Sequence, residues 1–473
     1  MSTQIWRRAA WAAVSSALLG AFGCAAWAQQ PALPAAPQVH LLLAAAGQAP
    51  MQNDGAAGQS SSAQTDTAPR LTIAEAEQMA IRNNPNISVA RLLALAQAQV
   101  TREARSAEMP LATGSLTAVG SHPNSRITAG LLNNPSIYNR AAGGLAVSEL
   151  ITDFGHTHNL VLSAKSSARA QLEDERATEL DITLTVDQAF YQALTAQAVL
   201  HVAEQTLAQR QATGDQVGAL TKAKIKSDLD LSFANVQVAQ ANLMLVDARN
   251  DAQSAIAALN DVLGSETDQG YTLVDETNGN PPPAPQDAEA QVQSALSARP
   301  DLAAMNDESL AARQYSTAER ELWMPTVSAL AVVGGTPVRS DQIESSWYGA
   351  AGANINIPIF NGFLFNAEAK EAKLRAQADQ EKVRDLRDVI ARDVRTAVLN
   401  AQAAFQRIAV TQEMLSQANF ALDLAQARYK IGLSSIVELT QAQLAQTQAE
   451  IENTTSRYAY QTALAEVRYQ VGQ

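Results

Sequence analysis

Apolar residues recur every three or four positions over long stretches of this chain. The longest such series is Val383, Leu386, Ile390, Val394, Ala397, Ala401, Ala404 and Ile408. This spacing is typical of the buried seam of a coiled coil. It predicts one helix from about Phe363 to Tyr429, which at 1.5 Å per residue is roughly 100 Å long. A second long helix is predicted from His158 to about Ala212.

A glycine and then another helical pattern follow each long helix. The returning helices are predicted from about Ser227 to Leu263 and from about Ser435 to Tyr469. Because glycine permits a chain reversal that a β-branched residue resists, we predict a turn at each glycine. The residues of the two predicted turns are Val217, Gly218 and Ala219 in one case and Ile431, Gly432 and Leu433 in the other.

Shorter stretches alternate between two kinds of side chain, which is the pattern of a strand. Residues 111–120 and 349–360 each place apolar side chains on one face and small or polar side chains on the other. The apolar positions are Leu116, Ala118, Ala351, Ala353, Ile355 and Ile357. Residues 142–151 form a less regular partner, and a further extended stretch follows Pro325. We expect four strands of a barrel between lipid and a wet lumen, and a soluble two-sided sheet is the alternative.

Helix-breaking pairs recur along the chain at a nearly constant offset. Asn84-Pro85 matches Arg299-Pro300, Met109-Pro110 matches Met324-Pro325, Phe154-Gly155 matches Asn361-Gly362, and Leu263-Gly264 matches Val471-Gly472. The two turn glycines are 214 positions apart, from 218 to 432, which is close to the same offset. The repetition predicts a duplicated unit of roughly 200 residues.

This repetition defines the predicted domains. Residues 70–280 form the first repeat, with a helix, two strands, a long helix and a returning helix. Residues 281–290 are a proline-rich linker, and residues 291–473 form the second repeat. Residues 29–69 are rich in Pro, Ala, Gln, Ser and Gly without a sustained period, so we predict a disordered leader there.

The N-terminus has the pattern of a signal peptide, residues 1–28. Arg7 and Arg8 precede an apolar stretch from Ala9 to Phe22, and Ala26-Trp27-Ala28 matches a cleavage site. Cys24, the only cysteine, is the alternative site of processing, since GAFGC is similar to a lipidation signal. Both possibilities predict export. No later apolar run reaches the ~18 residues of a membrane-spanning helix, so we expect any membrane insertion to use a β-barrel.

Charge and composition narrow the function further. The net charge is −13, which argues against binding to nucleic acid or to anionic lipid headgroups. Aromatic residues make up only 5% of the chain although 47% is hydrophobic, as suits long helices packed through small side chains. No G-x-S-x-G, H-E-x-x-H or P-loop pattern occurs, so we expect neither an enzyme nor a cofactor.

The signal peptide, the duplicated units and the stretch RYKIGLSSIVEL with its returning helix together resemble the TolC-type outer-membrane efflux protein family. The resemblance covers about Leu71 to Gly472. It implies a mixed, mainly α fold: a long coiled-coil α-barrel plus a transmembrane β-barrel built from four strands per protomer, 12 in a homotrimer. It also implies an outer-membrane exit duct in a Gram-negative bacterium, serving a tripartite efflux or type I secretion system with a periplasmic adaptor and an inner-membrane transporter.

The resemblance assigns roles to individual residues. The two glycine turns would meet the adaptor. Family members carry two acids after the second turn that narrow the periplasmic mouth; here these positions hold Glu438 and Gln441, which halves the charge. Ser434 replaces an arginine that helps to latch the turns. Three further mouth candidates are Tyr429, Asp228 and Asp230.

Other interpretations of these residues stay open. Glu438 is also explained as a solvated acid near a helix N-terminus, and Tyr429 as a packed aromatic. His156 and His158 suggest a metal site, but their spacing puts them on different sides of a helix and no cysteine is near. For the whole chain the rival functions are a structural coiled-coil protein of the envelope, which leaves the strands unexplained, and an exported enzyme, which lacks a visible polar site.

Overall fold

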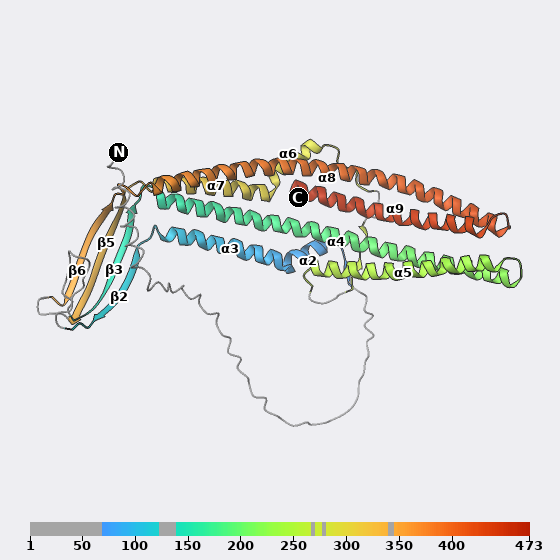
Figure 1. Cartoon of the computed structure of the whole chain (residues 1–473), viewed down its shortest axis with the longest axis horizontal. Helices are drawn as coiled ribbons and strands as arrows, with labels where there is room; N and C mark the ends of the chain where they lie inside the picture. Colours follow the sequence, from blue (N-terminus) through green and yellow to red (C-terminus); the bar gives the residue numbers. More distant parts are fainter. Residues whose placement is uncertain (1–68, 123–138, 266–269, 277–280, 339–344) are drawn as a thin grey trace, which may run out of the picture. The chain divides into compact units, whose positions relative to one another are not determined.

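The computed structural model describes residues 69–122, 139–265, 270–276, 281–338 and 345–473. The predicted signal peptide, Cys24 and nearly all of the predicted leader lie outside the described residues. The described residues all belong to one compact unit, Asp66–Gln473. Helices dominate this unit, and a four-stranded sheet accompanies them (Figure 1). Among the described residues, no helix is both long and apolar enough to cross a membrane.

Two series of elements follow one another along the chain. The first series contains α2 (Ile73–Asn83), α3 (Pro85–Ser106), β2 (Leu111–Val119), β3 (Arg140–Thr152), α4 (His156–Lys222) and α5 (Asp228–Val262). The second series contains α6 (Ala288–Ala298), α7 (Pro300–Glu321), β5 (Thr326–Val338), β6 (Trp347–Asn356), α8 (Leu364–Lys430) and α9 (Ile436–Val471). Two short strands, β1 (Arg70–Leu71) and β4 (Thr272–Leu273), pair in parallel. The helix α6 begins inside the predicted linker.

The long helices α4 and α8 each contain 67 residues and are therefore roughly 100 Å long. Near the sheet, α3 packs on α4, α4 on α7, and α7 on α8. Beyond the ends of α3 and α7, the returning helix α5 packs on α4, and α9 packs on both α4 and α8 (Figure 1). The predicted coiled-coil seam of α8 is buried or half-buried along its length, as a helix packed on two neighbours requires.

In each series, the residue between the paired short helices bonds to the end of the returning helix. Asn84 separates α2 from α3, and its side-chain amide donates to the carbonyl of Val262 at the end of α5 (2.9 Å). Arg299 separates α6 from α7, and it donates to the side chain of Gln470 near the end of α9 (2.6 Å). The end of each returning helix is thus fixed to the start of its own repeat.

The sheet joins the two series in the order β2-β3-β5-β6, with every neighbour antiparallel. Leu116 lies opposite Gly143, Gly143 opposite Gly335, and Gly335 opposite Trp347. Because partners across strands share a face, the two apolar sets predicted from the sequence lie on the same side. This face carries Ala112, Leu116, Leu145, Val147, Ala331, Val333, Ala351, Ala353 and Ile355. The opposite face is more polar, with Thr113, Ser115, Ser328, Asn354 and Asn356, although it also carries Leu111, Leu330, Val332 and Tyr348.

The prediction of the first turn at Val217–Gly218–Ala219 was wrong. These residues lie inside α4, which continues to Lys222, ten residues beyond the predicted end. A glycine in a helix costs only about 1 kcal/mol relative to alanine, so tertiary packing overrides it. Gly218 packs close to α5, where an added Cβ would lie 3.6 Å from the Leu231 side chain. The reversal occurs at Ala223–Ser227 instead.

Candidate functional site

Two hairpin turns, remote from the sheet, form the candidate site. The first hairpin joins α4 to α5 and the second joins α8 to α9 (Figure 1). Lys224 and Gly432 occupy equivalent positions with φ of +58° and +76°. In the first turn the Ile225 N–H donates to the Leu220 carbonyl, and in the second the Leu433 N–H donates to the Arg428 carbonyl, both at 2.9 Å. This is the Schellman arrangement that closes a helix C-terminus.

A serine starts each returning helix. Ser227 accepts from the Asp230 backbone N–H (3.2 Å), and the Asp230 carboxylate accepts in return from the Ser227 backbone N–H, which completes a capping box. Ser435 accepts from the Glu438 backbone N–H (3.3 Å). Asp230 and Glu438 therefore hold the same helical position, and every equivalent pair in the two turns is 208 residues apart.

The carboxylate of Glu438 does not complete a second capping box. Its Oε1 lies 3.3 Å from Arg428 Nε, and this ion pair connects α8 to α9 across the turn. Both side chains are about half exposed, so the pair contributes little to stability, roughly 0–1 kcal/mol. Of the other predicted mouth residues, Gln441 and Asp228 are exposed on the returning helices. Within one protomer, therefore, Glu438 is paired with Arg428 across the turn.

Tyr429 joins the two hairpins. Its ring is buried in a cluster that contains side chains of all four long helices near the turns. Lys226 Nζ of the first turn lies over this ring, 4.3 Å from the centroid. Burial, assisted by the negative charge of Asp230, raises the pKa of the Tyr429 hydroxyl. Within the described residues, neither this hydroxyl nor that of Ser434 has a hydrogen-bond partner, although both are buried.

A polar contact lies further along the same seam between α4 and α9. The Arg210 side chain is only 4% exposed, and its guanidinium donates to Gln443 Oε1. Gln443 in turn donates to Thr213 (3.2 Å). Burial lowers the pKa of Arg210. A buried cation held by a side-chain amide rather than by a carboxylate is costly, and this contact joins α4 of the first hairpin to α9 of the second.

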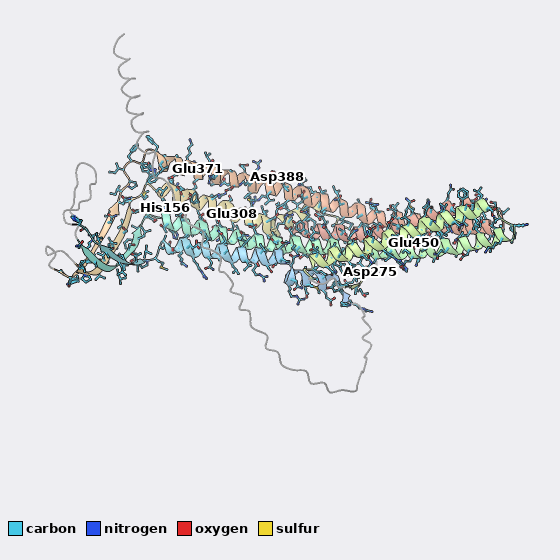
Figure 2. The ribbon with its side chains drawn as sticks, turned by 60° about the horizontal axis from the view of Figure 1, so that its bottom comes forward. His156, Asp275, Glu308, Glu371, Asp388 and Glu450 are labelled. Atoms are coloured by element: carbon cyan, nitrogen blue, oxygen red, sulfur yellow. The ribbon has the colours of Figure 1, made fainter. Side chains whose placement is uncertain are left out.

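The two histidines that suggested a metal site lie near different partners. His156 lies where α4 leaves the sheet (Figure 2), and its Nδ1 is 2.9 Å from the Ala318 carbonyl of α7. His158 lies 3.7 Å from the Glu108 carboxylate. Among the described residues, no group of three or more His, Cys, Asp or Glu side chains could hold a metal ion.

Because the predicted turns were placed at glycines, the prediction missed the first turn and its lysines. A better signal was present in the sequence. KAKIKSDLD (222–230) and KIGLSSIVE (430–438) share a lysine, an aliphatic residue three positions later, a serine at position six and an acid at position nine. The lysine that occupies the glycine position hid this match, because a non-glycine residue at positive φ is uncommon.

Comparisons with known proteins place this geometry in a family. The sequence pattern of the family described as outer membrane efflux protein matches residues 77–265 and 291–473. The outer membrane efflux protein BepC of Brucella suis is 25% identical over 409 residues, which cover 82% of this chain and 84% of BepC.

Solved structures share the fold. A structure of the transmembrane channel protein CusC superposes with a TM-score of 0.74 at 21% identity, covering 85% of this chain and 92% of that one. A membrane protein from Pseudomonas aeruginosa gives a TM-score of 0.74 at 22% identity, covering 85% and 93%. These matches confirm the mainly α fold, the outer-membrane location and the efflux function predicted from the sequence. The chain belongs to the outer membrane efflux protein family.

Proposed function

We propose that the chain is the exit duct of a tripartite efflux or type I secretion system, and that it conducts substrates passively to the cell exterior. The observation that carries this proposal is the combination of an open-edged sheet with helices roughly 100 Å long that end in paired turns. A membrane sheet, a long helical wall and a remote docking end are the three parts that such a duct needs.

The edges of the sheet support assembly from several copies. In the described part of the chain, β2 pairs only with β3 and β6 pairs only with β5 in this sheet. Unpaired strand edges cannot persist in lipid, so the sheet must close with other strands. The apolar face suits lipid and the polar face suits a wet lumen. Three copies would give the 12 strands that the family resemblance implies.

The helices support the same assembly. Leu92 of α3 and Leu243 of α5 are 65% and 62% exposed, and Leu399 and Phe420 of α8 are 63% and 70% exposed. Because α3 and α5 pack on one side of the unit and α8 on the other, these apolar surfaces suit contact between adjacent copies. The buried, unpaired hydroxyls of Tyr429 and Ser434 also suit a neighbour at the turns.

The paired turns are the proposed contact with a periplasmic adaptor, which would connect the duct to an inner-membrane transporter. The docking residues are Ala223–Lys226, in place of the incorrectly predicted Val217–Ala219, and Ile431–Leu433. Glu438, Gln441, Tyr429, Asp228 and Asp230 remain the proposed mouth residues. The division into leader, two repeats and linker stays a prediction.

Single-channel recording in a planar bilayer tests the duct. The purified full-length protein should give stable, ion-conducting channels. A folded assembly that inserts into the bilayer without any conductance would contradict the duct and would favour a structural coiled-coil role. Glu438→Gln should reduce cation preference if Glu438 lines the mouth, and unchanged selectivity would remove Glu438 from that role.

A further inference from the structure

The two turns present an apolar surface surrounded by lysines. We define the tip surface as Lys222, Lys224 and Ile225 of the first turn together with Lys430, Ile431 and Leu433 of the second. The shared cluster around Tyr429 and the contact of Lys226 with that ring hold the turns side by side. The tip surface is therefore one continuous face built from two distant parts of the sequence.

The charge of this face opposes the charge of the whole chain. Residues 216–227 contain three lysines and no acid, and residues 424–437 contain Arg428 and Lys430 and no acid, in a chain of net charge −13. Arg428 is paired with Glu438, and Lys226 lies over Tyr429. Lys222, Lys224 and Lys430 are exposed, and none forms an ion pair within the described residues. Three exposed cations without an ion-pair partner among the described residues thus lie at this end, and the exposed acids Asp215, Asp228 and Asp423 flank the two ranges.

Helix geometry explains only part of this charge. Lys222 and Lys430 lie in the last turns of α4 and α8, where the helix dipole favours a cation. Lys224 has no such explanation, because it occupies a left-handed position at which the second turn uses glycine. A side chain there costs conformational free energy, and strained positions of this kind persist where the side chain serves a function.

The apolar residues of the face are exposed where turns of this type usually cover them. In a Schellman turn the aliphatic residue after the left-handed position packs back onto its own helix. Ile225 and Leu433 occupy that position, yet they are 67% and 69% exposed, and Ile431 is 71% exposed. Large exposed apolar side chains that gather in one place mark an interaction surface.

We propose that the tip surface binds a protein that offers an apolar contact ringed by carboxylates, and that this is the chemistry of the adaptor end that docks here. The inference rests on the proposed function as a duct. Charge complementarity gives such a contact its orientation and its salt dependence. Anionic lipid fits less well, because the exposed Asp228 follows the first turn directly and the tip surface lacks an aromatic anchor.

Charge reversal with selection of suppressors tests this partner. The full-length variant Lys222→Glu/Lys224→Glu/Lys430→Glu is expressed in the natural host in place of the wild type. Efflux is measured with ethidium, sodium dodecyl sulfate or copper, whichever the deletion strain fails to expel. We expect at least a tenfold loss of efflux, since like charges would face each other in the interface. Reversal of three exposed lysines elsewhere, Lys165, Lys370 and Lys373, is the matched control and should leave efflux intact.

The suppressors identify the partner class. Restoration of efflux by acid-to-lysine changes in a periplasmic protein supports the inference. Normal efflux in the tip variant overturns it, as do suppressors confined to lipid synthesis or to this chain. Planar-bilayer recordings of the tip variant, made in parallel, should still show stable ion-conducting channels, which shows that the variant folds and assembles. Absence of conductance from the wild type would instead contradict the proposed duct.

Discussion

The first and second hairpins have the same backbone but carry different chemistry. Both long helices contain 67 residues, and both turns close with the same hydrogen bonds and the same serine cap. The first turn nevertheless has Lys224 where the second has Gly432, and its acid completes a capping box where the second acid pairs with arginine. Backbone geometry is therefore preserved between the copies, while the side chains have diverged.

The two copies also differ where α2 packs on α4 in the first copy and where α6 packs on α8 in the second. In the first copy Glu77 of α2 faces Asp187 of α4, and Arg468 of α9 lies 2.8 Å from Asp187. At the corresponding positions of the second copy are Val292 of α6, which is buried, and Arg395 of α8. Arg395 pairs instead with Glu289 (2.8 Å). One copy thus has a buried Asp187 beside a half-buried Glu77, where the other has the buried aliphatic Val292.

The largest expected effect comes from Gly432→Pro. Proline cannot adopt the φ of +76°, and it lacks the N–H that donates to the Tyr429 carbonyl (3.1 Å). We expect the second turn to lose about 3 kcal/mol or more and efflux to be abolished. Assembled protein in the membrane and hydrogen exchange at residues 425–440 provide the readout. Unchanged efflux would show that this turn is not needed for docking.

The carboxyl pair should make the first copy sensitive to pH. Burial, together with the hydrogen bond that protonated Asp187 donates to Glu77, raises the pKa of Asp187 from 3.8 to about 7. The folded state then binds a proton that the unfolded state releases, so the free energy of unfolding falls as pH rises from about 4 to about 7. Above that range it levels off. We expect a loss of about 2–4 kcal/mol, seen as weaker protection of α2 against hydrogen exchange at pH 8 than at pH 5.

Two variants test whether this pH dependence comes from Asp187 rather than from another acid of α4. Asp187→Asn keeps an acceptor for Arg468 and should remove most of the pH dependence. Asp181→Asn, which changes another acid of α4 that bonds Tyr469 (2.5 Å), is the control and should leave it unchanged. Equal protection of α2 at both pH values in the wild type would contradict the raised pKa of Asp187. The α6–α8 contact of the second copy offers an internal comparison, because Val292 does not titrate.

A smaller effect is expected at the buried contact of Arg210. In the described part of the chain its one hydrogen-bond acceptor is Gln443, and the corresponding residue of α8 is Ala418. Gln443→Leu would leave the guanidinium buried without an acceptor and should destabilise the seam by about 1–3 kcal/mol. The double variant with Arg210→Met should recover this loss. Thermal unfolding of the assembly measures both, with Gln448→Leu on the exposed face of α9 as control.

The apolar periodicity of the sequence predicted the helices well, whereas the glycine at position 218 located the first turn wrongly. The seam from Val383 to Ile408 is set by burial against two neighbours, which a repeating apolar pattern records. A turn is set by the backbone, and Gly218 shows that a glycine does not mark one when packing favours a helix. The contact of Lys226 with Tyr429 joins segments about 200 residues apart, so no local pattern contains it.

The finest test exchanges the residues at the left-handed positions. Lys224→Gly should stabilise the first turn by about 1 kcal/mol, because glycine adopts positive φ without strain. Gly432→Ala should destabilise the second turn by about 1 kcal/mol; an added Cβ meets no atom within 4 Å, so the cost is that of the backbone alone. Hydrogen exchange at the two turns measures both changes. If Lys224→Gly stabilises the turn and yet weakens efflux, the strain at Lys224 is maintained for its charge, and Lys224→Arg should then restore efflux. A stabilised turn with normal efflux would mean that the two hairpins differ at this position without consequence for docking.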